Sequence, residues 1–114
     1  MANFKLNVNM SKKDIINAKT SSLKITPSDA ILTVSGVAIV ENGGTDIDGN
    51  CCDVGYIATD EGVFGFISNV MLRNLDLLGD YLTDCLNDGE LCRIQFISGK
   101  TKEDTEFYSF RIVD

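Results

Sequence analysis

The sequence contains no histidine, no tryptophan and a single proline among its 114 residues. Histidine is the side chain that most often transfers protons near neutral pH, so its absence removes the commonest general acid and base. The motifs GxSxG, GxxxxGK[ST] and HExxH, which mark serine hydrolases, phosphate-binding loops and zinc proteases, are also missing. The sequence therefore predicts that the chain is not an enzyme and needs no cofactor.

Long apolar runs are missing as well. No stretch approaches the roughly 18 apolar residues that cross a bilayer, and the polar start MANFKLNVNMSKK lacks the apolar segment of a signal peptide. We therefore expect a cytoplasmic protein without membrane contact. At 114 residues the chain is long enough for one hydrophobic core and too short for two, so residues 1–114 are expected to form a single domain.

The four cysteines, Cys51, Cys52, Cys85 and Cys92, form no CxxC pair, and without histidine they are a poor set of zinc ligands. We interpret them as reduced packing residues. One of the adjacent pair Cys51 and Cys52 is expected to be exposed, because neighbours in a strand point to opposite faces. The acidic turn at 46–50 does not fit the spacing of a calcium loop. No metal site is predicted.

Alternating apolar and β-branched residues predict strands at 30–40, 51–59, 63–67, 90–98 and 106–113. Between the third and fourth of these, apolar residues recur at helical spacing from Asn69 to Leu86, and the predicted helix ends at Gly89. Gly36, in the first strand, is either a bulge that bends the strand or a residue that merely weakens it. The predicted order is strand, strand, strand, helix, strand, strand.

This order is the one used by the OB-fold, a five-stranded, partly open Greek-key barrel with its helix between the third and fourth strands. We therefore predict an α+β domain, mainly β with one helix, whose residues 29–114 form an OB-like core. Residues 1–28 are expected to form an N-terminal appendage. It comprises a short strand, Phe4 to Val8, and one or two helical turns capped by Ser11.

The formal net charge of −7 is distributed unevenly. Residues 1–40 carry five basic and two acidic side chains, residues 41–92 carry one basic and eleven acidic side chains, and residues 93–114 are balanced. Exposed charges more than about 8 Å apart are largely screened at physiological salt. A local basic strip can therefore bind phosphates despite an acidic total, so nucleic acid remains a candidate ligand.

OB barrels bind oligonucleotides across their second and third strands and between the first-to-second and fourth-to-fifth loops. In the last hairpin, cations flank a ring that can stack on a base, which predicts nucleic-acid contacts from Arg93, Lys100, Lys102, Phe107 and Arg111. The second and third strands add the rings of Tyr56, Phe64 and Phe66. One face of the third strand must pack inward, so either its two phenylalanines or Val63 and Ile67 are buried.

Lys12 and Lys13 have two open interpretations: they extend this binding path, or they serve contacts between subunits. The first-to-second loop opposes a nucleic-acid ligand, because Glu41, Asp46 and Asp48 would repel phosphates. The chain is expected to be a monomer or a small homo-oligomer.

Several short stretches resemble the small single-stranded DNA-binding proteins of tailed bacteriophages, particularly those with protein-primed genomes. The stretches are VSGVAIVEN, a turn that contains DG, GFIS before the helix, and GKTKEDTEFYSFRIV, which together span roughly Leu32 to Val113. The resemblance implies an OB-type fold and binding of single strands without sequence preference, alongside replication proteins, in the cytoplasm of a bacterial host cell. It also implies stacking of bases on Tyr56 and on the last hairpin.

An acidic protein-binding module is the alternative function. Asp76, Asp80, Asp84 and Asp88 recur on the polar face of the predicted helix. With the turn acids they would present a negative surface to a basic host site, as a small phage inhibitor of a nucleic-acid-binding protein would. Binding of oligonucleotides discriminates between the two functions.

Overall fold

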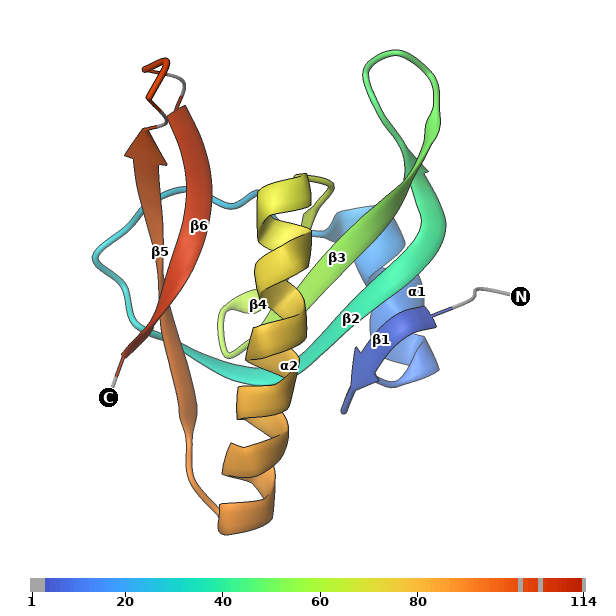
Figure 1. Cartoon of the computed structure of the whole chain (residues 1–114). Coiled ribbons are helices and arrows are strands. Elements are labelled where there is room, and N and C mark those ends of the chain that lie inside the picture. Colours follow the sequence, from blue (N-terminus) through green and yellow to red (C-terminus); the bar gives the residue numbers. More distant parts are fainter. Residues whose placement is uncertain (1–3, 101, 105, 114) are drawn as a thin grey trace.

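A computed structural model gives the order of the elements along the chain. It describes residues 4–100, 102–104 and 106–113, except for the side chains of residues 20, 21, 106 and 107. The elements are β1 (Phe4–Val8), α1 (Lys12–Ser21), β2 (Leu32–Thr45), β3 (Cys51–Thr59), β4 (Gly62–Phe66), α2 (Asn69–Asp88), β5 (Cys92–Lys100) and β6 (Glu106–Val113). The fold is α+β, and the strands pair antiparallel. From β2 to β6 the predicted order of strands and helix is confirmed (Figure 1).

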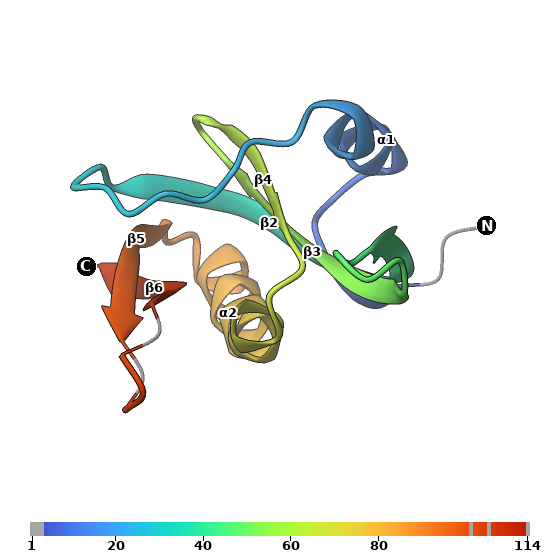
Figure 2. The same ribbon diagram turned by 90° about the horizontal axis from the view of Figure 1, so that it is seen from above.

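The strand β2 is shared by the two halves of the sheet, whose order is β4-β3-β2-β5-β6. One edge of β2 pairs with β3. The other edge pairs first with β5, at residues 32–34, and then with β1, at residues 37–40. Because β2 curves between these two segments, β5 and β6 lie apart from β3 and β4 (Figures 1 and 2). The described strands form an open, strongly bent sheet.

Gly36 lies at the bend of β2. The pairing of β2 with β3 shifts register between Val34 and Gly36, which confirms that this glycine marks a bulge. A Cβ atom at position 36 would lie 2.7 Å from the Cγ of Met10 and 3.0 Å from the carbonyl oxygen of Asn9. The chain that leads from β1 to α1 therefore passes β2 so closely that a side chain at this position would clash.

One face of α2 fills the concave side of the bent sheet (Figure 2). The buried residues of this face are those that the sequence period predicts: Met71, Leu75, Leu78, Leu82 and Cys85. They form one cluster with Val37, Ile57, Ile94 and Phe96 of the sheet. The helix ends at Gly89, whose φ of 71° lies in the left-handed region that glycine adopts without strain.

The helix α1 covers the other face of β2 and β3. Its N-terminus is closed by a capping box, in which the Oγ of Ser11 accepts the N–H of Asp14 and the Asp14 carboxylate accepts the N–H of Ser11. Ile15 and Ala18 are buried against a second cluster, formed by Ala38, Val40, Val54, Tyr56 and Ala58. The segment expected as an appendage thus contributes a strand and a helix to the same packed unit.

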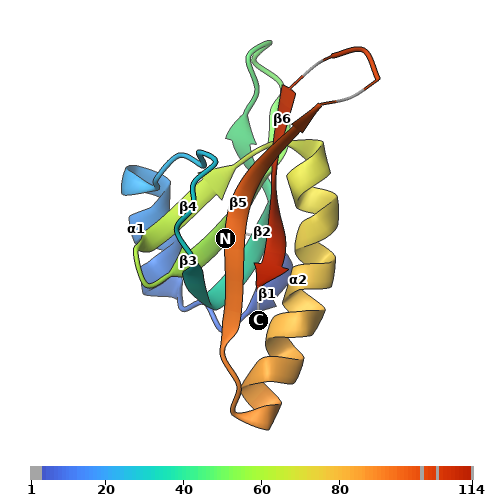
Figure 3. The same ribbon diagram turned by 90° about the vertical axis from the view of Figure 1, so that its left-hand side faces the viewer.

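The chain between α1 and β2 links the two halves of the bent sheet (Figure 3). Near its start, the N–H of Leu23 donates to the carbonyl oxygen of Val63 in β4, and the Leu23 carbonyl accepts the N–H of Gly65. Farther along, the N–H of Ser28 donates to the carbonyl oxygen of Phe96 in β5. We call residues 22–31 the connector.

We predict that Leu75→Ala destabilises the protein by about 2 to 5 kcal/mol, because it opens a cavity under α2. Leu75 is fully buried, whereas Leu77 on the same helix is 70% exposed. Leu77→Ala, the matched control, should change the free energy of unfolding by less than about 0.5 kcal/mol. Urea denaturation of both variants measures the difference, and equal losses would contradict this packing.

Candidate nucleic-acid interface

The rings of β3 and β4 point into the protein. Tyr56 is only 4% exposed and lies beneath α1, so it cannot stack on a base without a rearrangement; the sequence did not reveal this cover. Phe64 meets the ring of Phe96 edge to face, with centroids 4.9 Å apart. Phe66 packs against the same cluster, whereas Ile67 is exposed. The two phenylalanines therefore face the cluster under α2, while Val63 packs against the cluster under α1.

Lys12 and Lys13 lie far from the last hairpin. Both are exposed on α1, which lies on the opposite side of the molecule from β5 and β6 (Figures 1 and 2). They therefore do not extend a path along that hairpin, and a role in contacts between subunits is the interpretation that remains.

The two arginines of the last hairpin lie close together near one end of β5. Arg111 pairs with Gln95 in the ladder, and Arg93 pairs with Val113 two positions away. Such diagonal neighbours on one face lie roughly 7 to 8 Å apart. The Nε of Arg111 donates to the Oε1 of Gln95 at 2.8 Å, and the Nε2 of Gln95 donates to the carbonyl oxygen of Ser28 at 2.8 Å. These bonds tie β6, β5 and the connector together.

The two lysines lie at the other end of the hairpin. Lys100 is roughly 17 Å along β5 from the Gln95–Arg111 pair, at about 3.4 Å per residue. Its Nζ forms an exposed ion pair with the Oδ1 of Asp104 at 3.4 Å, whereas Lys102 has no ion-pair partner among the described residues. The lysines and the arginines therefore lie at opposite ends of the hairpin, and their predicted contacts with nucleic acid stay predictions.

A shallow groove runs along β5 between the position of Gln95, which bonds Arg111, and that of Ser98, two residues before Lys100. It lies between the connector and β5, has a volume of about 440 Å³ and is lined by residues 27–29 and 95–98. Gln95 lies at its arginine end, and Ser98 lies toward Lys100. We call this cavity the β5 groove. The cations near the two ends of β5 suit a phosphate backbone, whereas the carboxylate of Asp29, which lines the groove, does not.

Tyr108 is an exposed ring at this site that the sequence did not single out. It pairs with Ser98 and is 43% exposed. Alternation along the last strand places Tyr108 on the same face as Phe110. That face is apolar and is expected to be buried, so the sequence does not suggest Tyr108 as a binding residue. Phe107 pairs with Gly99, but its predicted stacking role concerns a side chain that lies outside the described part of the structure.

The β2–β3 and β5–β6 hairpins extend toward the same end of the molecule (Figures 1 and 3). In the β2–β3 turn, the Oδ1 of Asp46 accepts the N–H groups of Asp48 and Asn50 at 2.9 and 3.0 Å. This carboxylate therefore shapes the turn. Across the described residues, no group of three or more aspartate, glutamate and cysteine side chains is placed to hold a metal ion.

The four cysteines differ in burial. Cys85 and Cys92 are buried, and burial raises the pKa of Cys92 to about 11. This thiol therefore stays protonated at neutral pH and packs in the core. Cys51 is exposed and Cys52 is half-buried, as expected for neighbours in a strand.

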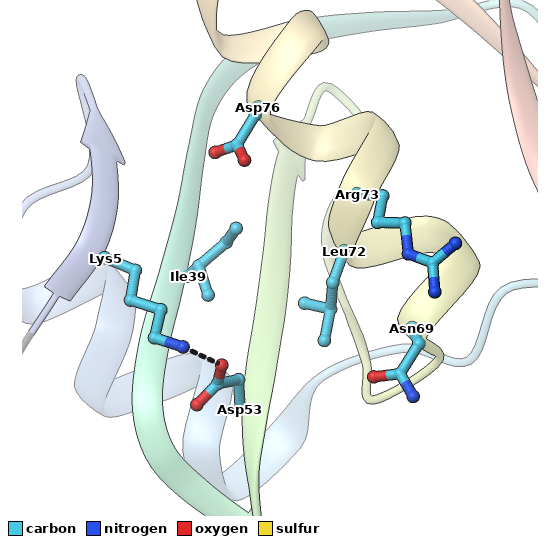
Figure 4. A pocket seen from close by; sticks show the side chains of 7 residues that line it. All are labelled: Lys5, Ile39, Asp53, Asn69, Leu72, Arg73 and Asp76. Atoms are coloured by element: carbon cyan, nitrogen blue, oxygen red, sulfur yellow. Dashed lines mark hydrogen bonds and ion pairs between the residues drawn. The ribbon is translucent and has the colours of Figure 1, made fainter.

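A second cavity, of about 280 Å³, lies between β1, β3 and α2 (Figure 4). Across it the Nζ of Lys5 meets the Oδ2 of Asp53 at 2.7 Å, and the Oδ1 of Asp53 accepts the N–H of Asn42 at 3.1 Å. The hydrogen bond from Lys5, and then that from Asn42, lower the pKa of Asp53. The hydrogen bond to Asp53 raises the pKa of Lys5. These two side chains neutralise each other and join β1 to β3.

We predict that Asp53→Asn lowers the melting temperature at neutral pH. The folded-state pKa of Asp53 lies below its ordinary value of 3.8, so its stabilisation is present at neutral pH and is lost as the pH falls through that lowered pKa. The difference from the unmodified protein should therefore vanish in strong acid. Asp76 lines the same cavity and has no hydrogen-bond or ion-pair partner among the described residues. Asp76→Asn should therefore change the melting temperature little at any pH between neutral and strong acid.

Equal melting temperatures for Asp53→Asn and the unmodified protein at pH 7 would contradict a stabilising ion pair. So would a difference that grows in acid.

Neither helix in the described ranges has the length and apolar character needed to span a membrane. Comparison of the chain with models of protein families, with curated protein sequences and with solved structures gives no match. The function of the chain must therefore be inferred from its own residues and their arrangement.

Proposed function

We propose that this chain binds single-stranded DNA without sequence specificity, through an OB-type core whose β5 groove takes the phosphate backbone. The observation that carries the proposal is the last hairpin, which has two arginines near one end of β5, two lysines at its other end and the exposed ring of Tyr108 on β6. The β5 groove runs along the edge of β5 that faces the connector. No cofactor is needed for binding of this kind, because phosphate contacts and base stacking supply the affinity.

The strand order supports the OB-type core. Three core strands precede α2 and two follow it, as in that barrel. The sheet path β4-β3-β2-β5-β6 has two end strands, β4 and β6, and these are the strands that a closed barrel would join. The long strand β2, bent at Gly36, contributes to both halves, which is how one strand turns the corner of a small barrel.

The position of α1 supports the β5 groove as the path of the DNA. In OB-folds the ligand usually crosses the second and third strands, which correspond here to β3 and β4. One face of these strands is covered by α1 and buries Tyr56. Residues 102–104 of the fourth-to-fifth loop are exposed and the β5 groove is open, so the ligand is displaced toward the last hairpin.

The expected binding mode follows from the spacing of the cations. Arg93 and Arg111 hold phosphates at one end, and Lys100 and Lys102 hold them at the other, roughly 24 Å from Arg93 along β5. That span suits a site of about four nucleotides, the lower end of the range for OB-folds. Tyr108 offers a face for one base. The resemblance to phage proteins extends the proposal to DNA replication in a bacterial cytoplasm, alongside replication proteins.

The proposal is tested by measuring the affinity for fluorescent single-stranded and duplex oligonucleotides at several salt concentrations. We expect binding of the single strand that weakens steeply with salt, with a slope of about −0.7 per phosphate contact. The double variant R93A/R111A should bind more weakly and show a shallower slope. K12A/K13A, on the far side, is the matched control and should bind a short oligonucleotide normally. Absence of single-strand binding at low salt would contradict the proposal and favour the acidic protein-binding module.

We predict that Asp104→Asn strengthens binding of single-stranded DNA several-fold. The substitution releases Lys100 from its ion pair and removes a negative charge beside the DNA. Asparagine tolerates the left-handed backbone at this position, where φ is 64°, so the hairpin should be retained. Asp88→Asn removes an equal charge at the far end of α2 and should leave the affinity unchanged. Weaker binding by Asp104→Asn would contradict this role of Lys100.

A further inference from the structure

We propose that copies of this chain associate head to tail, with α1 of one copy docked in a groove between α2 and β6 of the next. This contact is independent of nucleic acid. Only its consequence for coating DNA rests on the proposed function.

The receiving surface is an apolar groove of about 420 Å³ between α2 and β6. Leu77 projects beside it with 70% exposure, and Ile112 across it is 41% exposed. Phe110 and Tyr81 are half-buried in its walls. A volume of this size takes two or three apolar side chains of a partner, and the exposed leucine and isoleucine gain from being covered.

The surface of α2 beside Leu77, next to this groove, is acidic. Asp80 and Asp84 lie three and seven residues after Leu77 on α2, so the three side chains share one side of the helix. Both aspartates are exposed, and neither has an ion-pair partner among the described residues. Asp76 precedes Asp80 by about one turn and lines the cavity of Figure 4 instead. The groove thus fits an apolar side chain flanked by cations.

The outer face of α1 carries that pattern. Ile16 is 64% exposed, although the helix buries its neighbour Ile15. Ile16 has three lysines as neighbours on the helix surface. Lys12 lies four residues before it, Lys13 three residues before it and Lys19 three residues after it. All three are exposed and have no ion-pair partner among the described residues. Charge and apolar character are therefore complementary to the groove.

The two surfaces lie on opposite sides of the molecule (Figures 1 and 2). A contact between different surfaces is heterologous, and one that does not close into a ring continues as a linear array. One helix face buries less than the roughly 800 Å² per partner of a stable interface, so we expect weak association of the free protein. A single strand held by adjacent copies would raise their effective concentration and make its coating cooperative.

The test is sedimentation of the free protein, without DNA, up to about 1 mM. We expect an average mass that rises with concentration beyond that of a dimer and falls when salt is added. Charge reversal on either surface, in K12E/K19E or in D80K/D84K, should leave a monomer. Mixing these two variants should restore an alternating array, because the acidic α1 of the first fits the basic surface of the second, and the unmodified α1 of the second fits the unmodified surface of the first.

Reversal of a charge elsewhere is the control: Lys102→Glu, on the last hairpin, should associate like the unmodified protein. A protein that stays monomeric throughout, an average mass that stops at the dimer, or a mixture that fails to associate would overturn the proposal. No DNA is present in this experiment, so its result does not depend on whether the protein binds oligonucleotides. If the protein does not associate, an isolated copy can still bind a single strand.

Discussion

The burial of one face of α2 in the concave side of the bent sheet is the interaction on which the rest of the structure depends. The helix contributes Met71, Leu75, Leu78 and Leu82 to a cluster that also contains residues of β2, β3 and β5. Each such side chain contributes roughly 1.5 to 3 kcal/mol by leaving water. Because both halves of the sheet contact the same helix, this burial fixes how far β5 and β6 lie from β3 and β4.

Much of this arrangement could be predicted from local sequence patterns. The apolar period of α2 and its end at Gly89 are visible in the sequence, and so are the two hairpins. The strand β2 extends beyond the predicted range, because Gly44 and Thr45, which read as part of a turn, still pair with β3. Gly36 allowed two interpretations, a bulge that bends the strand or a residue that weakens it. The close approach of Met10, which requires a glycine at this position, is a contact between distant segments and is not visible in the local sequence.

The candidate site was harder to predict, because it depends on contacts between segments far apart in the chain. Nothing in the alternation of β3 shows that α1 covers Tyr56. The β5 groove forms only because the connector hydrogen-bonds to Phe96, and the connector contains the single proline and otherwise reads as a turn. Charge counts showed where acid and base lie along the chain, but not that Lys100 is paired with Asp104.

The central claim is that single-stranded DNA lies along the last hairpin with a base on Tyr108. Tyrosine emission reports on this directly, because the chain has no tryptophan and only three tyrosines, of which Tyr56 is buried and Tyr108 is exposed. Titration with oligothymidine should quench part of this emission, and Tyr108→Phe should keep most of the affinity while losing the quenching. Quenching that persists undiminished in Tyr108→Phe, or binding without any quenching in the unmodified protein, would contradict the account.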